Sequence, residues 1–351
     1  MNHVLKRWLK AVIPPVLDAT GVYERRIEAA ARGRGLWLVL MYHRVGDVTM
    51  ADPFGMGMCV TPGRFRDHIR FLQEEFEILP AGEMLQRLNQ NGWQEGKYAS
   101  ITFDDGYLDN LEVAAPILDE LGIRATVYVP TGGWENGDWF WWDRVIRAFR
   151  LTSVGHVPAA ALDPLGAAAS MALNGIRARA AAASAVIEGL WRQHPDSIPD
   201  RVSEVEEALG VAPPAPWERN RLTIGDVAAL AERGWEIGAH SITHPKLTAL
   251  SPDRIRRELR GSRRTLEEAL GIRVHGFAYP AGYVGPEIER EVREAGYRYA
   301  VTTERGVNTK LSRPLRIMRM GAADEGVANV RRCVASLCVR GAGLEVAHDT
   351  V

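Results

Sequence analysis

The sequence Ser100-Ile101-Thr102-Phe103-Asp104-Asp105-Gly106-Tyr107 joins a short apolar run to two adjacent carboxylates and a glycine. The run predicts a strand, and the glycine permits a sharp exit from it, so Asp104 and Asp105 are expected at the mouth of a sheet. Two neighbouring acids there are costly if they are buried and unpaired. The pair therefore indicates a metal site, a catalytic role or a helix cap, and the remaining sequence has to decide among the three.

Apolar runs of the same kind recur on both sides of this stretch and alternate with helical patterns. Residues 36–43 are almost wholly apolar, which is typical of a strand buried on both faces of a parallel sheet. Further strands are expected at 76–79, 123–130, 235–240, 276–280, 299–303 and 315–320, and helices at 63–75, 81–89, 116–122, 225–233, 252–270 and 286–295. This repeated strand–helix–strand order predicts an α/β domain with parallel strands.

Composition divides the chain into four expected parts. They are a helical leader (1–35), an α/β domain (36–150 and 217–322), an inserted region (151–216), and a C-terminal helix and tail (323–351). The inserted region is Ala-rich and strand-poor and ends in a proline-rich run, which predicts helices. The helix expected at 252–270 is rich in Arg and Glu, which is typical of a solvated face rather than a binding surface.

Bulk composition excludes several classes of protein. The 351 residues are 46% hydrophobic and 25% charged, and the net charge of −1 gives no general case for nucleic-acid binding. Three cysteines are too few for a disulfide framework.

No stretch predicts a transmembrane helix or a signal peptide, which favours the cytoplasm. Residues 1–16 are basic and amphipathic, so they predict a helix that either packs on the domain or lies on a membrane surface. The oligomeric state is left open.

A second strand end carries two histidines. The strand expected at 235–240 leads into His240-Ser241-Ile242-Thr243-His244. Histidines four apart can point to one side, and with one carboxylate they form a set that leaves metal positions open for water and substrate. Either histidine alone would more often be structural. Their position at the end of a strand in the same domain as the Asp pair favours a shared site.

A third strand end is Tyr279-Pro280-Ala281-Gly282. Proline and glycine at these positions predict a tight turn, and such a turn can aim backbone N–H groups at an oxyanion.

Three motifs follow one another along the chain: Thr102-Phe103-Asp104-Asp105-Gly106, His240-Ser241-x-x-His244-Pro245 and Tyr279-Pro280-x-Gly282. In this order they resemble the motifs of the polysaccharide deacetylase family (NodB homology domain, carbohydrate esterase family 4). The resemblance covers residues 36–150 and 217–322. It implies a distorted (β/α) barrel and a divalent metal, Zn²⁺ in the first place, with Co²⁺, Ni²⁺ or Mn²⁺ as alternatives. It also implies a glycan as the partner and acetyl removal from N-acetylated sugars of a polysaccharide or lipid-linked glycan as the reaction.

The resemblance also assigns roles to individual residues. Asp105, His240 and His244 would bind the metal, and Asp104 would be the general base. The metal would lower the pKa of a bound water and polarise the acetyl carbonyl. The backbone N–H of Ala281 matches the position that helps to hold the oxyanion.

Two departures from the family pattern affect the catalytic half of the site. Many members carry an arginine that orients the base where this chain has Ala278, so Arg44 or Arg319 would have to replace it. The histidine that many members use as general acid is not evident either. His43, at the end of the first strand, is the preferred substitute, and a structural role for it is an equal alternative.

Aromatic residues are the candidates for substrate contact, because aromatic faces stack on sugar rings. Tyr107, Tyr279, Trp139 and Trp142 are assigned this role, with anchoring of the insertion as the structural alternative for some of the tryptophans. Two other functions stay open for the whole chain. One is a different carbon–nitrogen hydrolase of the same fold, and the other is a glycan-binding relative that has lost turnover.

Overall fold

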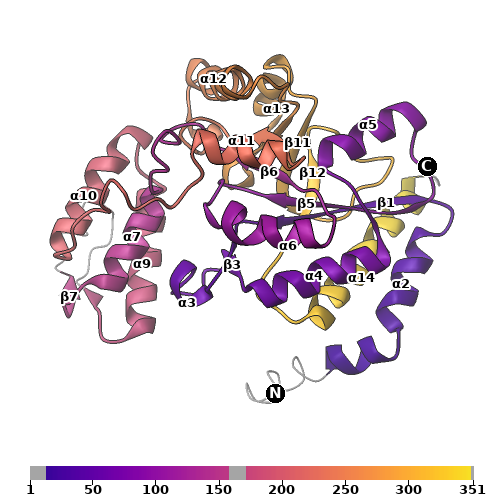
Figure 1. Cartoon of the computed structure of the whole chain (residues 1–351), viewed down its shortest axis with the longest axis horizontal. Coiled ribbons are helices and arrows are strands. Elements are labelled where there is room, and N and C mark those ends of the chain that lie inside the picture. Colours follow the sequence, from indigo (N-terminus) through magenta and orange to yellow (C-terminus); the bar gives the residue numbers. More distant parts are fainter. Residues whose placement is uncertain (1–12, 158–170, 349–351) are drawn as a thin grey trace. The chain divides into compact units, whose positions relative to one another are not determined.

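The computed structural model describes residues 13–157 and 171–348, which form two compact units (Figure 1). Within the described residues, the barrel unit comprises 13–47, 58–132 and 224–348. The second unit comprises the other described residues, 48–57, 133–157 and 171–223.

Parallel strands form the centre of the barrel unit. In sheet order they are β1 (Gly35–Tyr42), β12 (Ile317–Gly321), β11 (Tyr299–Arg305), β10 (Gly276–Ala278), β9 (Glu236–Ala239), β6 (Thr126–Val129), β5 (Gly96–Phe103) and β4 (Glu77–Ile78). Because β1 also pairs with β5 along its whole length, the sheet closes, and β4 remains attached only to β5. The expected distorted (β/α) barrel is thereby confirmed.

The division of β5 between two partners explains part of the distortion. Its first half pairs with β4 through Tyr98 and Ala99, and its last two residues, Thr102 and Phe103, pair with β6. The strand therefore changes its outer neighbour just before the Asp pair. Phe103 is fully buried and stacks on Tyr42 at a centroid distance of 5.6 Å, which holds the carboxyl ends of β5 and β1 together.

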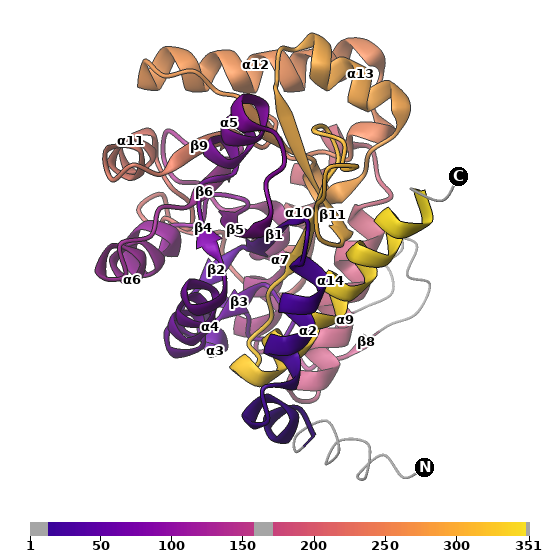
Figure 2. The same ribbon diagram turned by 90° about the vertical axis from the view of Figure 1, so that its right-hand side faces the viewer.

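Helices cover the outside of the barrel unit (Figure 2). They are α2 (Val22–Ala31), α4 (Pro62–Glu75), α5 (Ala81–Asn91), α6 (Ala115–Glu120), α11 (Ile224–Glu232), α12 (Pro252–Leu270), α13 (Pro286–Glu294) and α14 (Val327–His348). Shorter elements are the π-turn Asn110–Ala114, the 3₁₀ turns Leu247–Ala249 and Pro280–Gly282, and the paired strands β2 (Arg44–Val45) and β3 (Cys59–Val60). Each amphipathic helix buries one face, as Ile255, Leu259 and Leu266 do on α12.

The second unit has its own apolar core. Its elements are α3 (Val48–Ala51), α7 (Trp141–Leu151), the short antiparallel pair β7 (His156–Val157) and β8 (Met171–Ala172), α9 (Ile176–Leu190), the 3₁₀ turn Pro195–Ser197 and α10 (Ile198–Ala208). Phe149, Val186 and Val202 are fully buried in that core, one from each of the three longer helices. The unit includes residues 133–150, which the composition assigns to the barrel.

A helix from the N-terminal region and one from the C-terminal region pack together on the barrel unit. Helix α2 lies beside α14 in both views (Figures 1 and 2). The membrane contact predicted for residues 1–16 falls mostly outside the described residues. Among the helices that the structure describes, none combines the length and the apolar character needed to cross a bilayer.

Candidate active site

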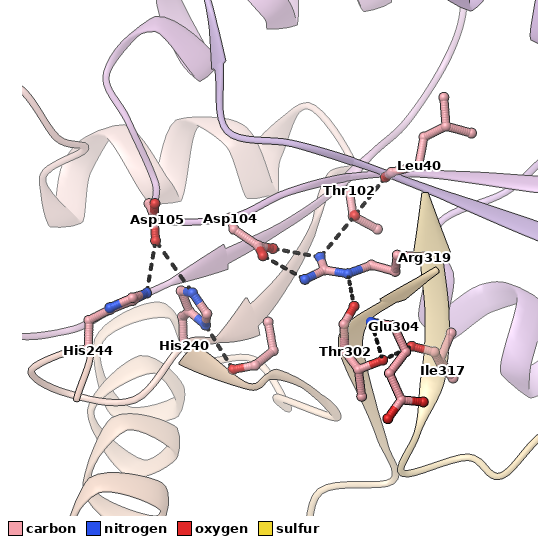
Figure 3. Close-up of polar contacts among 11 residues, drawn as sticks. Leu40, Thr102, Asp104, Asp105, His240, His244, Thr302, Glu304, Ile317 and Arg319 are labelled. Carbon is pink, nitrogen blue, oxygen red and sulfur yellow. Dashed lines mark hydrogen bonds and ion pairs between the residues drawn. The ribbon is translucent and has the colours of Figure 1, made fainter. Parts of the chain in front are cut away.

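The carboxyl ends of the strands bring the polar motifs of the sequence together (Figure 3). Asp104 and Asp105 follow β5, His240 follows β9, and the turn that contains Ala281 follows β10. The sheet order β5-β6-β9-β10 makes these strand ends near neighbours, and parallel strands open their carboxyl ends on one edge.

Asp105, His240 and His244 converge on one point. Oδ1 of Asp105 lies 3.4 Å from Nε2 of His240 and 3.3 Å from Nε2 of His244. The ligand atoms of the three side chains lie within 4.8 Å of one another, and all three residues are buried. Although these distances are those of ion pairs, Oδ1 of Asp105 accepts no hydrogen bond from any described residue. A buried carboxylate oxygen in that state fits a bound cation.

The tautomer of His240 supports the same interpretation. Its Nδ1 lies 2.7 Å from the carbonyl oxygen of Ala278. A carbonyl can only accept, so Nδ1 carries a proton, and in its neutral form His240 presents the lone pair of Nε2 to Asp105. Two acceptors then face each other across 3.4 Å. This is a stable arrangement only when a proton or a metal ion lies between them.

The charges in this set are mutually dependent. Burial raises the pKa of Asp105, but His240 and His244 lower it more, so the pKa lies well below its ordinary value. Burial lowers the pKa of His240, while Asp105 and Asp104 raise it to above its ordinary value. Burial also lowers the pKa of His244, and here burial prevails. Asp105 is therefore anionic at neutral pH, as a metal ligand must be.

Arg319 holds Asp104 on the other side of the same strand end (Figure 3). Its Nη1 and Nη2 donate to the two oxygens of Asp104 at 2.7 and 2.6 Å, and its Nε donates to the carbonyl of Thr302 at 2.8 Å. Both side chains are almost completely buried. Burial raises the pKa of Asp104, but Arg319 lowers it more, so the carboxylate is ionised with a depressed pKa. The bidentate pair fixes the orientation of the carboxylate.

Backbone strain is concentrated at this site. In the described residues, four non-glycine residues have a positive φ: Asp105 (72°), Ser241 (66°), His244 (54°) and Ala281 (54°). Such conformations are uncommon outside glycine, and each has a free-energy cost of about 1–3 kcal/mol. Their grouping at three strand ends indicates a geometry that serves function rather than stability.

The family model named polysaccharide deacetylase matches residues 91–150 and 217–300, which include the Asp pair, both histidines and the Ala281 turn. The chain belongs to the polysaccharide deacetylase family. YxkH of Bacillus subtilis (strain 168) is 20% identical over 273 residues, which are 78% of this chain. The match spans 66% of YxkH, so this chain corresponds to about two thirds of that relative.

Solved structures resemble this deacetylase-family chain in fold. The Streptococcus pyogenes deacetylase PplD, in complex with acetate, has a TM-score of 0.56 at 19% identity, covering 85% of this chain and 98% of PplD. IcaB from Ammonifex degensii has a TM-score of 0.53 at 17% identity, covering 87% of this chain and 97% of IcaB. At these identities the comparisons establish the barrel of the polysaccharide deacetylases as the fold of this chain.

The histidine loop of this deacetylase barrel is held by Glu258 of α12, which the sequence analysis did not single out. Oε2 of Glu258 accepts from the backbone N–H groups of Ile242 and Thr243 at 2.7 and 2.9 Å, and Oε1 accepts from Oγ1 of Thr243 at 2.8 Å. Within the loop, Oγ of Ser241 accepts from the N–H of His244 at 3.0 Å. Glu258 is buried, so its three hydrogen bonds stabilise the strained path that presents both histidines.

Replacing Glu258 by glutamine is expected to weaken Zn²⁺ binding by about 10–100-fold, because the amide loses the charge and places an NH₂ group against backbone donors. Calorimetric titration with Zn²⁺ measures this effect. Thr243→Val is the matched control, since it removes one of the three hydrogen bonds and keeps the carboxylate, and it is expected to have a smaller effect. Wild-type affinity in a folded Glu258→Gln protein would contradict the role given to Glu258.

His43 and Arg44 follow β1 at the same edge of the barrel. Arg44 pairs with Asp109 at 2.8 Å, so of the two arginines considered for Asp104, the structure selects Arg319. The carbonyl of His43 accepts from Nδ2 of Asn110 at 2.8 Å, which fixes its backbone. His43 contributes to the electrostatic stabilisation of the carboxylate of Asp104, and its side chain is partly exposed.

The structure corrects two tyrosines assigned to substrate contact. Tyr279 is fully buried, and its hydroxyl donates to the carbonyl of Leu315 at 3.0 Å. Tyr107 is 1% exposed, with the guanidinium of Arg44 4.6 Å from the centre of its ring. Neither ring has a free face for a sugar, because each follows a strand end but turns into the core.

Trp139 and Trp142 belong to the second unit. Trp142 is buried and stacks on Phe140 at 4.2 Å, so the prediction that it contacts substrate is corrected to a structural role. Trp139 is half-buried, and its Nε1 donates to the carbonyl of Glu218 at 2.6 Å. Substrate contact by Trp139 stays a prediction.

Proposed function

We propose that this chain is a metal-dependent hydrolase that removes acetyl groups from N-acetylated sugars of a polysaccharide or a lipid-linked glycan. The observation that carries the proposal is the position of Asp104, ionised and locked by Arg319, next to the convergent set Asp105, His240 and His244. Membership of the polysaccharide deacetylase family supports the reaction class. Acetate bound to the structurally similar PplD is consistent with acetate as the product.

Asp105, His240 and His244 would hold the metal. One carboxylate oxygen and two imidazole nitrogens suit Zn²⁺ best, with Co²⁺, Ni²⁺ and Mn²⁺ as alternatives. When bound, the metal supplies Lewis-acid polarisation of the acetyl carbonyl and makes a neighbouring water more acidic. Oδ1 of Asp105, which accepts no hydrogen bond from the described residues, and the lone pair that neutral His240 would turn toward it fit this group.

Asp104 would serve as the general base. Arg319 occupies both of its oxygens from one side and keeps the carboxylate ionised, so it can accept a proton from a nucleophilic water. The depressed pKa makes Asp104 a weak base but one that is available over a wide pH range. Arg319 acts as a positioning residue, and it replaces the arginine that this chain lacks at Ala278.

Two further groups complete the proposed reaction. The backbone N–H of Ala281, held in the left-handed region at φ 54°, would donate to the oxyanion that forms when water attacks the acetyl carbon. His43, beside the carboxylates, would donate a proton to the leaving amine. Cleavage of the C–N bond then releases acetate and a free amino sugar.

Acetate release from N-acetylglucosamine oligomers tests the proposal. The protein as purified, loaded with Zn²⁺ or Co²⁺, is expected to release acetate, to lose this activity after treatment with a chelator, and to regain it when metal is returned. A metal-loaded protein that binds the oligomers but releases no acetate would instead identify a binding protein. Release from a small cyclic amide but from no glycan would identify a different carbon–nitrogen hydrolase.

A further inference from the structure

A hollow on α12 is lined almost entirely by arginines. We name it the arginine hollow. Its lining consists of Arg256, Arg257, Arg260, Arg263, Arg264, Arg273, Gly261, Ala295 and Glu267. Its volume is about 670 Å³. Six arginines and one glutamate therefore line a hollow that is large enough for a small ligand.

The carboxylates nearby neutralise only part of this charge. Arg256 pairs with Glu291 at 3.0 Å and with Asp253 at 2.5 Å. Arg263 pairs with Glu267 at 3.2 Å, and Arg264 lies 4.0 Å from Glu268. The side chains of Arg257, Arg260 and Arg273 have no hydrogen-bond or ion-pair partner among residues 13–157 and 171–348. Like charges held at short range repel one another, and an anion bound between them would remove that repulsion.

A neighbouring cavity of about 1090 Å³ shares Arg273 with the arginine hollow. Its charged lining is mixed, with Arg298 and His275 as well as Glu77, Glu83 and Glu236. The side chain of Arg298 also lacks a partner in the described part of the chain, and Nδ1 of His275 is buried without one. Burial lowers the pKa of His275, and Arg298, Arg263 and Arg273 lower it further, against a smaller opposite effect of Glu267. The field at this imidazole is thus positive.

These residues lie away from the candidate active site. Arg273 precedes β10 and Arg298 precedes β11, so both mark the amino ends of the barrel strands, whereas Asp104 and Asp105 lie at the carboxyl end of β5. Helix α12 runs along the outside of the barrel unit (Figure 2). A ligand of the arginine hollow would therefore not compete with a substrate at the Asp pair.

We propose that the arginine hollow binds a phosphate-bearing anion that carries several negative charges. Guanidinium groups bind phosphate through paired N–H···O bonds, and the three free oxygens of one phosphate can be shared by several arginines. A carboxylate offers two oxygens and one charge, which match a single arginine and not this cluster. The phosphate can belong to a soluble polyphosphate or to the headgroup of an anionic phospholipid.

Binding of inorganic tripolyphosphate, measured by calorimetry at low salt on the whole chain, is the first arm of the test. Co-sedimentation with phosphatidylglycerol vesicles, with phosphatidylcholine vesicles as reference, is the second. In the arm that shows binding, the double variant Arg260→Ala/Arg273→Ala is expected to weaken it at least about tenfold. Because both side chains are exposed and unpaired among the described residues, the variant should fold and release acetate as the wild type does.

Arg290→Ala is the matched control, since Arg290 is an exposed arginine of α13 that pairs with Glu294 outside the hollow. It is expected to bind like the wild type. Arg260→Lys/Arg273→Lys keeps both positive charges but loses the planar guanidinium groups that donate paired hydrogen bonds, so it should bind with intermediate strength. Binding of tripolyphosphate identifies a soluble source, and binding of vesicles alone identifies a headgroup. No binding in either arm, or equal weakening by Arg290→Ala, would overturn the proposal.

Discussion

Asp104→Asn is expected to lower kcat for acetate release by roughly 10²–10⁴-fold while the protein keeps its metal. The amide cannot accept a proton from water at neutral pH, whereas Asp105, His240 and His244 are unchanged by the substitution. The amide also turns an NH₂ group toward one of the Arg319 nitrogens that now donate at 2.7 and 2.6 Å. We therefore expect lower stability as well as lower activity.

The double variant Asp104→Asn/Arg319→Gln separates the two effects. It also removes the buried guanidinium charge that Asp104→Asn alone leaves without a carboxylate partner. Its free energy of unfolding should therefore exceed that of Asp104→Asn, while its activity should stay low. Denaturant unfolding and kcat are the two measurements. If activity recovered together with stability, the base would have to be a group other than Asp104.

Arg319→Ala is expected to lower the free energy of unfolding by about 3–5 kcal/mol, because it leaves the buried carboxylate of Asp104 without its partner. The pKa of Asp104 should rise, since burial would then act unopposed by the guanidinium. The acidic limb of the kcat/KM profile should move to higher pH. A side chain with only a structural role would not move that limb.

The pH dependence of stability has a definite sign. A carboxylate whose pKa is depressed by folding adds stability above its unfolded pKa, and this contribution is lost as the pH falls through the folded pKa. The stability lost in Arg319→Ala should therefore be largest near neutral pH and shrink below about pH 4. Arg319→Lys keeps the charge and should show a smaller loss. A loss that is independent of pH would contradict the ion-pair account.

Local patterns were sufficient to predict the parallel strands and helices of the α/β domain, whereas the barrel was implied by the family resemblance. A strand buried on both faces has an apolar run that is evident without its partners, as residues 36–43 show, and the strand expected at the Asp pair ends at Phe103. The convergence of Asp105, His240 and His244 was also predictable, because all three follow strands of the same barrel. Since the carboxyl ends of neighbouring parallel strands lie close together, the side chains that follow them are expected to lie close together as well. Their role as metal ligands stays a prediction, and the choice of Asp105 over Asp104 came from the family resemblance.

Partners supplied by distant elements were harder to predict. Arg319 lies 215 positions after Asp104, and the sequence left it as one of two candidates. Glu258 lies in a helix whose many charged residues indicate a solvated face, so the sequence did not distinguish it from the other charged residues of that helix. The sequence did not determine which way the aromatic rings point, because a ring that follows a strand end can turn toward the substrate or toward the core. Tyr107 and Tyr279 turn toward the core.

Zinc stoichiometry tests the central claim most directly. Wild-type protein, stripped with a chelator and titrated with Zn²⁺, is expected to bind one tight ion per chain. His240→Ala should lose at least about a hundredfold in affinity, because it removes one of three ligands and leaves Asp105 beside an empty position. His275→Ala, which alters a histidine outside the set, should bind like the wild type. Equal zinc affinity of His240→Ala and the wild type would contradict the account.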